Sequence, residues 1–322
     1  MILIVVEHAH GAPRKSAFEL VGVGRALAAA SGRPLAALVL GRDGDAVANE
    51  LTGFVADVHV VRDARLDPPR VETVTRAVAH AASALGASVV LVPASRAGLS
   101  YGPRVALRSG GALLEDVTSV AFEGDTVVAT RLTYLSRVNA TVVASATPVV
   151  VSVKLGAAAV APLADTRGSV HELAVPFEAD DERLEVVERQ RLVKGRVALE
   201  EADVVVCGGR GFGSSAAFEQ HVVALADALA AGVGATRAVV DAGWRPYGEQ
   251  IGQTGKTVAP KLYLALAVSG AVQHLSGMNR AGVIVAVNKD ADAPIFKVSD
   301  YGIVGDVLEV VPALQRALAG PD

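Results

Sequence analysis

Short runs of Val, Leu, Ile and Ala alternate along the chain with longer segments in which apolar residues recur at helical spacing. Gly, Pro, Asp or Asn bounds most of the runs, so we interpret them as strands buried on both faces of a sheet. Strands that alternate with helices predict βαβ units and a mostly parallel sheet. The fold class we expect is α/β, with two Rossmann-like three-layer α/β/α domains.

The same pattern predicts the individual elements of the first half. We expect strands at 1–6, 35–40, 57–61, 88–93, 117–122, 126–132 and 141–153, and helices at 16–30, 45–54, 71–85 and 101–109. Gly32 and Gly86 follow two of these helices, in the position where glycine ends a helix.

A second α/β unit is predicted from residue 203. Its expected strands are 204–207, 236–241, 262–268 and 283–287, and its expected helices are 215–231, capped by Ser214 or Ser215, and 307–318. The segment 180–201 carries many charges of both signs, and we interpret it as a solvated connection between domains. The predicted domains are therefore 1–200 and 201–322.

Composition narrows the possible functions. The chain is 51% hydrophobic but only 4% aromatic, and its net charge of -4 gives no electrostatic footprint for nucleic acid. A single cysteine, Cys207, excludes an internal disulfide and fits a reducing compartment. No targeting segment is evident, and the longest apolar runs are too short to span a bilayer. We expect a cytoplasmic protein without membrane insertion.

Small residues and hydrogen-bond donors gather where strands of the second unit end, which is where open α/β sheets bind ligands. The turn 208–213 joins a strand to a helix and contains Arg210, which can pair with phosphate. Its spacing differs from GxGxxG, so a nucleotide site and an ordinary βα turn are both possible. The segment 252–257 lacks the first glycine of a P-loop, which argues against that motif.

The stretch Ser269-Gly270-Ala271 follows an apolar strand and opens a short helix that carries Gln273 and His274. Such a turn can hold a pyrophosphate. A histidine beside these donors can be a ligand or a structural residue. Arg237, in a predicted strand, can likewise lie at the sheet edge or be held for a ligand. No cluster has metal-ligand spacing, and no catalytic constellation is evident.

Five segments carry a specific resemblance. They are VVVCGGRGFGS (204–214), GATRAVVDAGW (234–244), QIGQTGKTVAPKLYLALAVSGAVQHLSGM (250–278), VAVNKDADAPIF (285–296) and DYGIVGDVLEVVPAL (300–314). With these segments the chain resembles the α-subunit of electron transfer flavoprotein. The first half resembles the family more loosely, and the stretch 134–139 departs from the glycine-containing version.

The resemblance implies a heterodimer with a β-subunit, one FAD in the C-terminal domain, and AMP in the β-subunit. It implies electron transfer from dehydrogenases, such as acyl-CoA dehydrogenases, to a quinone oxidoreductase. The residues that the resemblance places at the pyrophosphate and ribitol are Arg210, Ser269, Gly270, Ala271 and Gln273. It places Thr254 at flavin N(5) with Gly252 and Gln253 alongside, Arg237 over the isoalloxazine, and His274 near its O(2). It also implies that Asn288 and Asp306 lie at the adenosine and that Thr236 has a hydroxyl role. Gly211, Ile251, Val272 and Val307 complete the candidate cofactor-binding set.

Three other functions compete with an electron carrier. An electron-bifurcating flavoprotein would have a second flavin in the β-subunit and the same α-subunit site. A nucleotide-dependent enzyme, such as a deacylase, would need a separate catalytic His or Asn. A non-catalytic adenine-nucleotide sensor would bind no chromophore.

Overall fold

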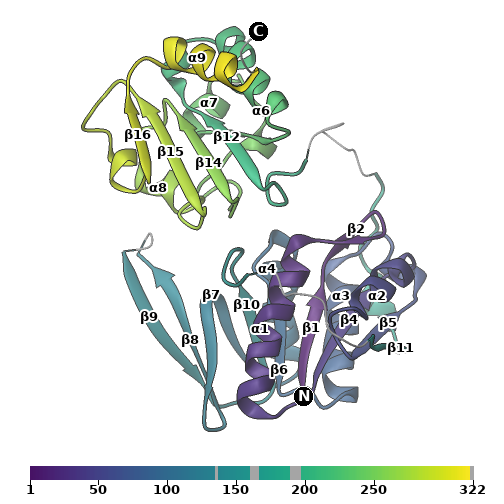
Figure 1. Ribbon diagram of the computed structural model, residues 1–322. Coiled ribbons are helices and arrows are strands. Elements are labelled where there is room, and N and C mark those ends of the chain that lie inside the picture. The colour runs from purple at the N-terminus through teal and green to yellow at the C-terminus, as the bar shows by residue number, and fades with distance from the viewer. Residues whose placement is uncertain (135–136, 160–166, 189–196, 320–322) are drawn as a thin grey trace. The chain divides into compact units, whose positions relative to one another are not determined.

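The computed structural model describes residues 1–134, 137–159, 167–188 and 197–319 (Figure 1). The chain divides into two compact units, Met1–Gln190 and Arg191–Asp322. Each unit is built on one large sheet with helices packed against it, so the expected α/β class with two mostly parallel, sheet-based domains is confirmed.

The sheet of the first unit has, among the described residues, the strand order β11-β5-β4-β1-β6-β10-β7-β8-β9. Its strands are β1 (Ile2–Val6), β4 (Leu35–Leu40), β5 (Asp57–Val61), β6 (Val89–Pro93), β7 (Ala112–Glu123), β8 (Thr126–Thr133), β9 (Val138–Ala144), β10 (Val149–Val153) and β11 (Ser169–Glu172). Neighbours from β11 to β7 pair in parallel, and β8 and β9 extend the sheet in antiparallel. The short strands β2 (His8–Ala9) and β3 (Ala12–Pro13) form a separate hairpin.

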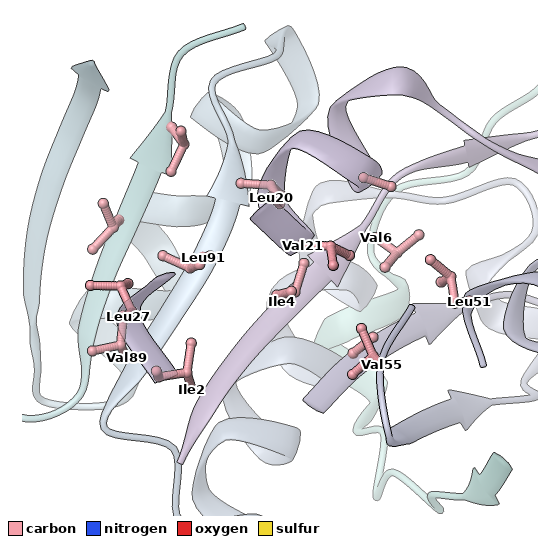
Figure 2. Close-up of a cluster of buried hydrophobic side chains, with 14 of the residues drawn as sticks. Ile2, Ile4, Val6, Leu20, Val21, Leu27, Leu51, Val55, Val89 and Leu91 are labelled. Carbon is pink, nitrogen blue, oxygen red and sulfur yellow. The ribbon is translucent and has the colours of Figure 1, made fainter. Parts of the chain in front are cut away.

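Helices cover both faces of this sheet. They are α1 (Lys15–Ser31), α2 (Gly44–Leu51), α3 (Val71–Ala84) and α4 (Arg96–Arg108). Residues of α1 and α2 pack on the face that presents Ile2 and Ile4, where Leu20 and Leu27 of α1 meet the strands (Figure 2). Residues of α3 and α4 pack on the opposite face, against Leu3 and other strand residues. The result is the three-layer arrangement that strands buried on both faces require.

The sheet of the second unit is parallel throughout, in the order β13-β12-β14-β15-β16. Its strands are β12 (Val204–Gly208), β13 (Gly232–Ala235), β14 (Leu262–Leu266), β15 (Val283–Asn288) and β16 (Tyr301–Val304), and its α-helices are α5 (Ser215–Phe218), α6 (Ala224–Ala228), α7 (Arg237–Asp241), α8 (Val272–Leu275) and α9 (Val307–Ala319). A π-helical segment, η4 (Glu219–Val223), joins α5 to α6. The described part of this unit also contains the short 3-10 turns η3 (Arg210–Phe212), η5 (Tyr247–Glu249) and η6 (Pro294–Lys297).

Several boundaries differ from those predicted. The strand expected at 236–241 is wrong: β13 ends at Ala235, and Arg237 begins the short helix α7. Val and Ala at 238–240 fit a strand as well as a helix, whereas the strand that forms, β13, contains two glycines and has only a weak strand pattern. A Cβ on Gly234 would lie 2.4 Å from Ile251 Cδ1, so a larger residue there would displace the Ile251 side chain. The expected strand 141–153 is divided into β9 and β10, and α4 begins earlier than predicted, at Arg96.

The charged segment 180–201 is also not simply a solvated connection. Its first residues form the 3-10 turn η2 (Ala179–Glu182) on the first unit, where Asp181 is only 3% exposed. Arg76 of α3 donates from Nε to Asp181 Oδ2 over 2.8 Å, and Arg70 donates to the Leu184 carbonyl over 2.6 Å. The charges of this part therefore fix the chain to α3. Residues 189–196 of the predicted connection lie outside the described residues.

Candidate functional site

The order of the second sheet creates a switch point between β12 and β14. The chain passes from β12 to β13 on one side, and β14 then pairs with the other side of β12. At such a point the two crossovers diverge and leave a crevice at the carboxyl ends of the strands, where ligands bind. The predicted turns 208–213 and 269–271 follow these two neighbouring strands, so the fold brings them together.

The two turns touch through positions that only glycine can occupy. The Gly209 N–H donates to the Leu266 carbonyl over 2.9 Å. A Cβ on Gly209 would lie 1.9 Å from the Ala267 carbonyl oxygen, and one on Gly211 would lie 2.7 Å from Ala267 Cβ. The missing side chains allow the backbone to approach a neighbour, or a ligand, more closely than any other residue permits.

The turn after β14 also contains backbone strain. Ala267 has a φ of 54° and Gly270 a φ of 81°. The left-handed region costs a non-glycine residue about 1–2 kcal/mol. Such strain is concentrated at binding sites, where the surrounding structure maintains it. A Cβ on Gly270 would also lie 2.3 Å from the Ile295 backbone nitrogen, so this turn is held tightly.

A third segment, 250–256, lies against the start of α8. The Ile251 N–H donates to the Ala235 carbonyl over 3.0 Å, which ties the segment to the end of β13. The Gln253 N–H donates to the Gln273 carbonyl over 2.8 Å. A Cβ on Gly252 would lie 2.7 Å from that same carbonyl, and the φ of Gly252 is 135°. Segments far apart in the sequence therefore form one continuous wall at the carboxyl ends of β13, β12 and β14.

Thr254 is held from two sides within this wall. The buried Gln250 donates from Nε2 to Thr254 Oγ1 over 2.9 Å, and the Tyr247 hydroxyl donates to the Thr254 carbonyl. The side chain of Thr254 is exposed. Because its oxygen accepts the bond from Gln250, the hydroxyl proton is available to an acceptor on a ligand.

Most of the predicted polar residues lie at the surface of this wall. The exposed ones are Arg210, Arg237, Gln253, Thr254, Ser269 and Gln273. Arg237 forms an i,i+4 ion pair with Asp241, with Nε 3.3 Å from Oδ2 and both side chains more than 60% exposed. Such exposed pairs contribute little, so the Arg237 guanidinium can turn toward an anionic ligand.

His274 is buried, unlike its neighbours. Its Nε2 lies 2.9 Å from the hydroxyl oxygen of Tyr263 and 4.0 Å from Cys207 Sγ. Burial lowers the pKa of His274 to about 4, and the Ile251 backbone opposes this effect. The imidazole is therefore neutral at ordinary pH. Of the two roles considered for this histidine, the structure shows a core contact.

The remaining predicted residues hold the local structure. Asn288 donates from Nδ2 to the Val268 carbonyl over 3.0 Å and accepts from the Asp290 N–H. Asp306 accepts from the Leu308 N–H over 2.9 Å, which caps α9. Thr236 precedes α7. Ile251 and Val307 are buried, whereas Gly211 and Ala271 are exposed and Val272 is half-buried.

Comparisons with known proteins agree with this arrangement. Residues 198–279 match the electron transfer flavoprotein FAD-binding domain, and residues 2–178 match the electron transfer flavoprotein domain. The chain is 38% identical to electron transfer flavoprotein subunit alpha of Thermoanaerobacterium thermosaccharolyticum, covering 97% of this chain and 96% of that one. The same subunit of Mycobacterium leprae is 40% identical, with the same coverage of both chains. The chain belongs to the electron transfer flavoprotein α-subunit family.

The matched FAD-binding domain of this family covers the turns after β12, β13 and β14, and ends before β15. The FixB protein of Clostridium saccharobutylicum, 36% identical over 97% of this chain and 95% of its own length, is a further relative. The site suits a dinucleotide because Gly209, Gly211 and Gly270 let the turns pack closely at the strand ends, and exposed donors, among them Arg210 and Ser269, lie on these turns. Among the described residues, no helix combines the length and apolar character needed to cross a membrane.

The sequence analysis did not identify several residues that shape the site at the carboxyl ends of β13, β12 and β14. Gln250 and Tyr247 hold Thr254, and Tyr263 contacts His274. Gln250 and Tyr247 lie beside the predicted turn, but no pattern shows which side chains turn back onto it. Tyr263, in an apolar strand, has a polar atom that needs a buried partner, which is a signal that the sequence does contain.

Proposed function

We propose that this chain is the α-subunit of a heterodimeric electron transfer flavoprotein and holds one FAD at the carboxyl ends of β13, β12 and β14. It takes electrons from dehydrogenases, such as acyl-CoA dehydrogenases, and passes them to a quinone oxidoreductase. The observation that carries this proposal is the contact between Gly209 and Ala267, which joins two glycine turns at the switch point of the sheet.

The exposed side chains divide the site into two parts. Arg210 and Ser269, with the backbone of 270–273, lie at the meeting turns and suit the pyrophosphate. Thr254, whose hydroxyl proton is available, and Arg237 lie on the segments after β13 and suit the flavin ring. Asn288 and Asp306, at the ends of β15 and β16, are the positions proposed for the adenosine.

The chemistry of electron transfer needs few groups from the protein. The flavin supplies the redox chemistry, and the protein sets its potential through charges and hydrogen bonds at the ring. Arg237 is a permanent cation and favours the reduced, more negative cofactor. Thr254 can donate a hydrogen bond to the ring, since its hydroxyl proton is available. This arrangement suits an electron carrier rather than an enzyme that converts its own substrate.

Among the described residues of the first unit, the switch point of the sheet is already occupied by a side chain. The switch point of its sheet lies between β1 and β6. There Ser95, which caps α4 by accepting from the Gly98 N–H over 3.0 Å, donates its hydroxyl to the carboxylate of Glu7. A carboxylate already lies where an anionic ligand would bind. This favours a single cofactor on the chain, in the second unit. The AMP that the resemblance implies is proposed for the β-subunit.

The test is to purify the chain with its β-subunit and measure the absorbance and number of bound flavins. One flavin per heterodimer supports the proposal, and two indicate a bifurcating flavoprotein with a second flavin in the partner. Turnover that depends on a nicotinamide nucleotide would indicate a deacylase-like enzyme instead. A colourless complex that cannot be loaded with FAD would exclude both the electron carrier and the bifurcating flavoprotein. The remaining hypothesis would then be a nucleotide sensor.

A further inference from the structure

A polar cluster lies beneath the candidate flavin site, within the core of the second unit. It consists of Cys207 from β12, Tyr263 from β14 and His274 from α8. Cys207 and Tyr263 have no exposed surface, and His274 is 7% exposed. The Tyr263 hydroxyl oxygen lies 2.9 Å from His274 Nε2, and Cys207 Sγ lies 4.0 Å from the same nitrogen. Apolar residues surround the cluster, among them Met278 and Ile295.

Burial fixes the protons of this cluster. It raises the pKa of Tyr263 well above its ordinary value and that of the Cys207 thiol to about 12, so both groups carry their protons. A tyrosine hydroxyl has one proton to donate, and a neutral imidazole has one nitrogen that accepts. The Tyr263 hydroxyl interacts with both Cys207 and His274 Nε2. Sulfur is a weak acceptor, so the favoured direction is Tyr263 O–H to His274 Nε2, which requires the imidazole proton to lie on Nδ1.

The surroundings of Nδ1, the other ring nitrogen, agree with a hydrogen bond donated by Tyr263 to Nε2. Nδ1 is buried and has no hydrogen-bond partner of normal geometry among the described residues. A hydrogen bond with the Ile251 backbone raises the pKa of His274, which is the effect of an acceptor close to a ring N–H. Since Nε2 faces Tyr263, the ring N–H that faces Ile251 is the one on Nδ1. The titratable groups that face the ring are Cys207 and Tyr263, and its described contacts include no carboxylate that would favour an imidazolium.

We propose that Tyr263 is a positioning residue for His274, which it holds as a neutral imidazole protonated on Nδ1. This inference rests on the proposed flavin site, because α8 and residues 251–253 form its wall. The consequence is that His274 orients a hydrogen-bonding edge of the wall but supplies no positive charge to the cofactor. The resemblance places Arg237 and His274 at the flavin ring, and of these two Arg237 is then the one that compensates the charge of the reduced flavin.

The experiment is nitrogen NMR of the histidine-labelled full chain in complex with its β-subunit, from pH 8 to pH 5.5. The His274 signals are assigned by their loss in His274→Gln. We expect a protonated Nδ1 and an unprotonated Nε2 at every pH in this range. In Tyr263→Phe, Nε2 loses its donor, and we expect a mixture of tautomers. Tyr301→Phe, which removes the hydroxyl of a tyrosine that is 66% exposed, is the matched control and should leave the signals unchanged.

Three results would overturn the proposal. They are an imidazolium within this pH range, a proton on Nε2 in the wild-type chain, and an unchanged tautomer in Tyr263→Phe. The wild-type spectrum decides the first two even if Tyr263→Phe does not fold. Flavin absorbance of the same samples tests the proposed function separately. A flavin-free complex would refute that function, whereas the Tyr263–His274 contact predicts the same tautomer with or without flavin.

Discussion

Gly209 and Ala267 lie so close that a Cβ on the glycine would be 1.9 Å from the alanine carbonyl oxygen. This contact joins the turn after β12 to the turn after β14. Both turns are backbone at this point, so neither can yield as a flexible side chain would. The relative position of the two turns, and with it the proposed cofactor site, therefore depends on the absence of a side chain at Gly209.

The first prediction follows from this contact. Gly209→Ala should separate the two turns, with an overpacking cost of about 1–3 kcal/mol, and should abolish flavin binding. The measurement is the flavin-to-protein ratio of the purified heterodimer, together with its thermal unfolding. Gly248→Ala is the matched control, because a Cβ there meets no atom within 4 Å. Full flavin content in Gly209→Ala would contradict the close contact of the turns.

The second prediction concerns the charge of Arg237. Its side chain is 71% exposed and pairs only with the exposed Asp241 among the described contacts, so Arg237→Ala should leave stability unchanged. Loss of a charge-assisted hydrogen bond of about 1.5–3 kcal/mol should lower the first-electron potential by about 60–130 mV. The measurement is stepwise reduction against dyes of known potential.

The matched control for Arg237 is Lys261→Ala. Lys261 lies just before β14, at the opposite end of the sheet, and pairs with Asp203 over 2.8 Å. Its removal lowers the net charge equally but far from the turns. If both variants shift the potential by the same amount, overall charge is responsible and Arg237 has no local role.

The sequence was sufficient to predict most of the scaffold. The strands at 35–40 and 57–61 have the predicted bounds, because Pro34 and Gly41 flank the first and Arg62 follows the second. The sequence also predicts a ligand at the turns after β12 and β14, and the structure brings these turns together, since carboxyl ends of neighbouring parallel strands share one edge. β13 was misplaced by a few residues because it contains two glycines, which give a weak strand pattern, and at Gly234 a close tertiary contact with Ile251 favours the small residue.

Side-chain direction could not be predicted in the same way. His274 and Gln273 are adjacent, yet one is buried against Tyr263 and the other is exposed. A helix of four residues such as α8 has too little periodicity to show which side faces the core. Asp181 presents the same difficulty, because its burial depends on Arg76, about a hundred positions earlier in the chain.

The third prediction uses that ion pair. Arg76→Ala should leave the Asp181 carboxylate, 3% exposed, without its main partner, at a cost of about 3–5 kcal/mol. Peptides covering 177–184 should then lose protection in hydrogen exchange, because η2 is released from α3. Arg183→Ala removes an ion pair with Asp180 whose side chains are both more than 70% exposed, and should leave the stability nearly unchanged. Equal effects of the two variants would show that the buried pair does not anchor this segment.

The fourth prediction is a pH dependence of stability that originates at His274. Burial lowers its pKa to about 4 in the folded chain, whereas an unfolded histidine has a pKa of about 6.5. Between these values the unfolded chain binds a proton that the folded chain does not bind. Stability of the second unit should therefore fall as the pH drops through this window, by about 1.4 kcal/mol per pH unit at the steepest.

The single tryptophan, Trp244, lies in the second unit and can report its unfolding by fluorescence in urea. We expect the free energy of unfolding to decrease from pH 6.5 to pH 5 in the wild-type chain, and His274→Gln to flatten this slope. Above pH 7.5 the two chains should show the same slope, which serves as the internal control. A wild-type stability that stays constant or rises on acidification would mean that His274 accepts a proton readily in the folded state, and the neutral imidazole beneath the flavin site would be refuted.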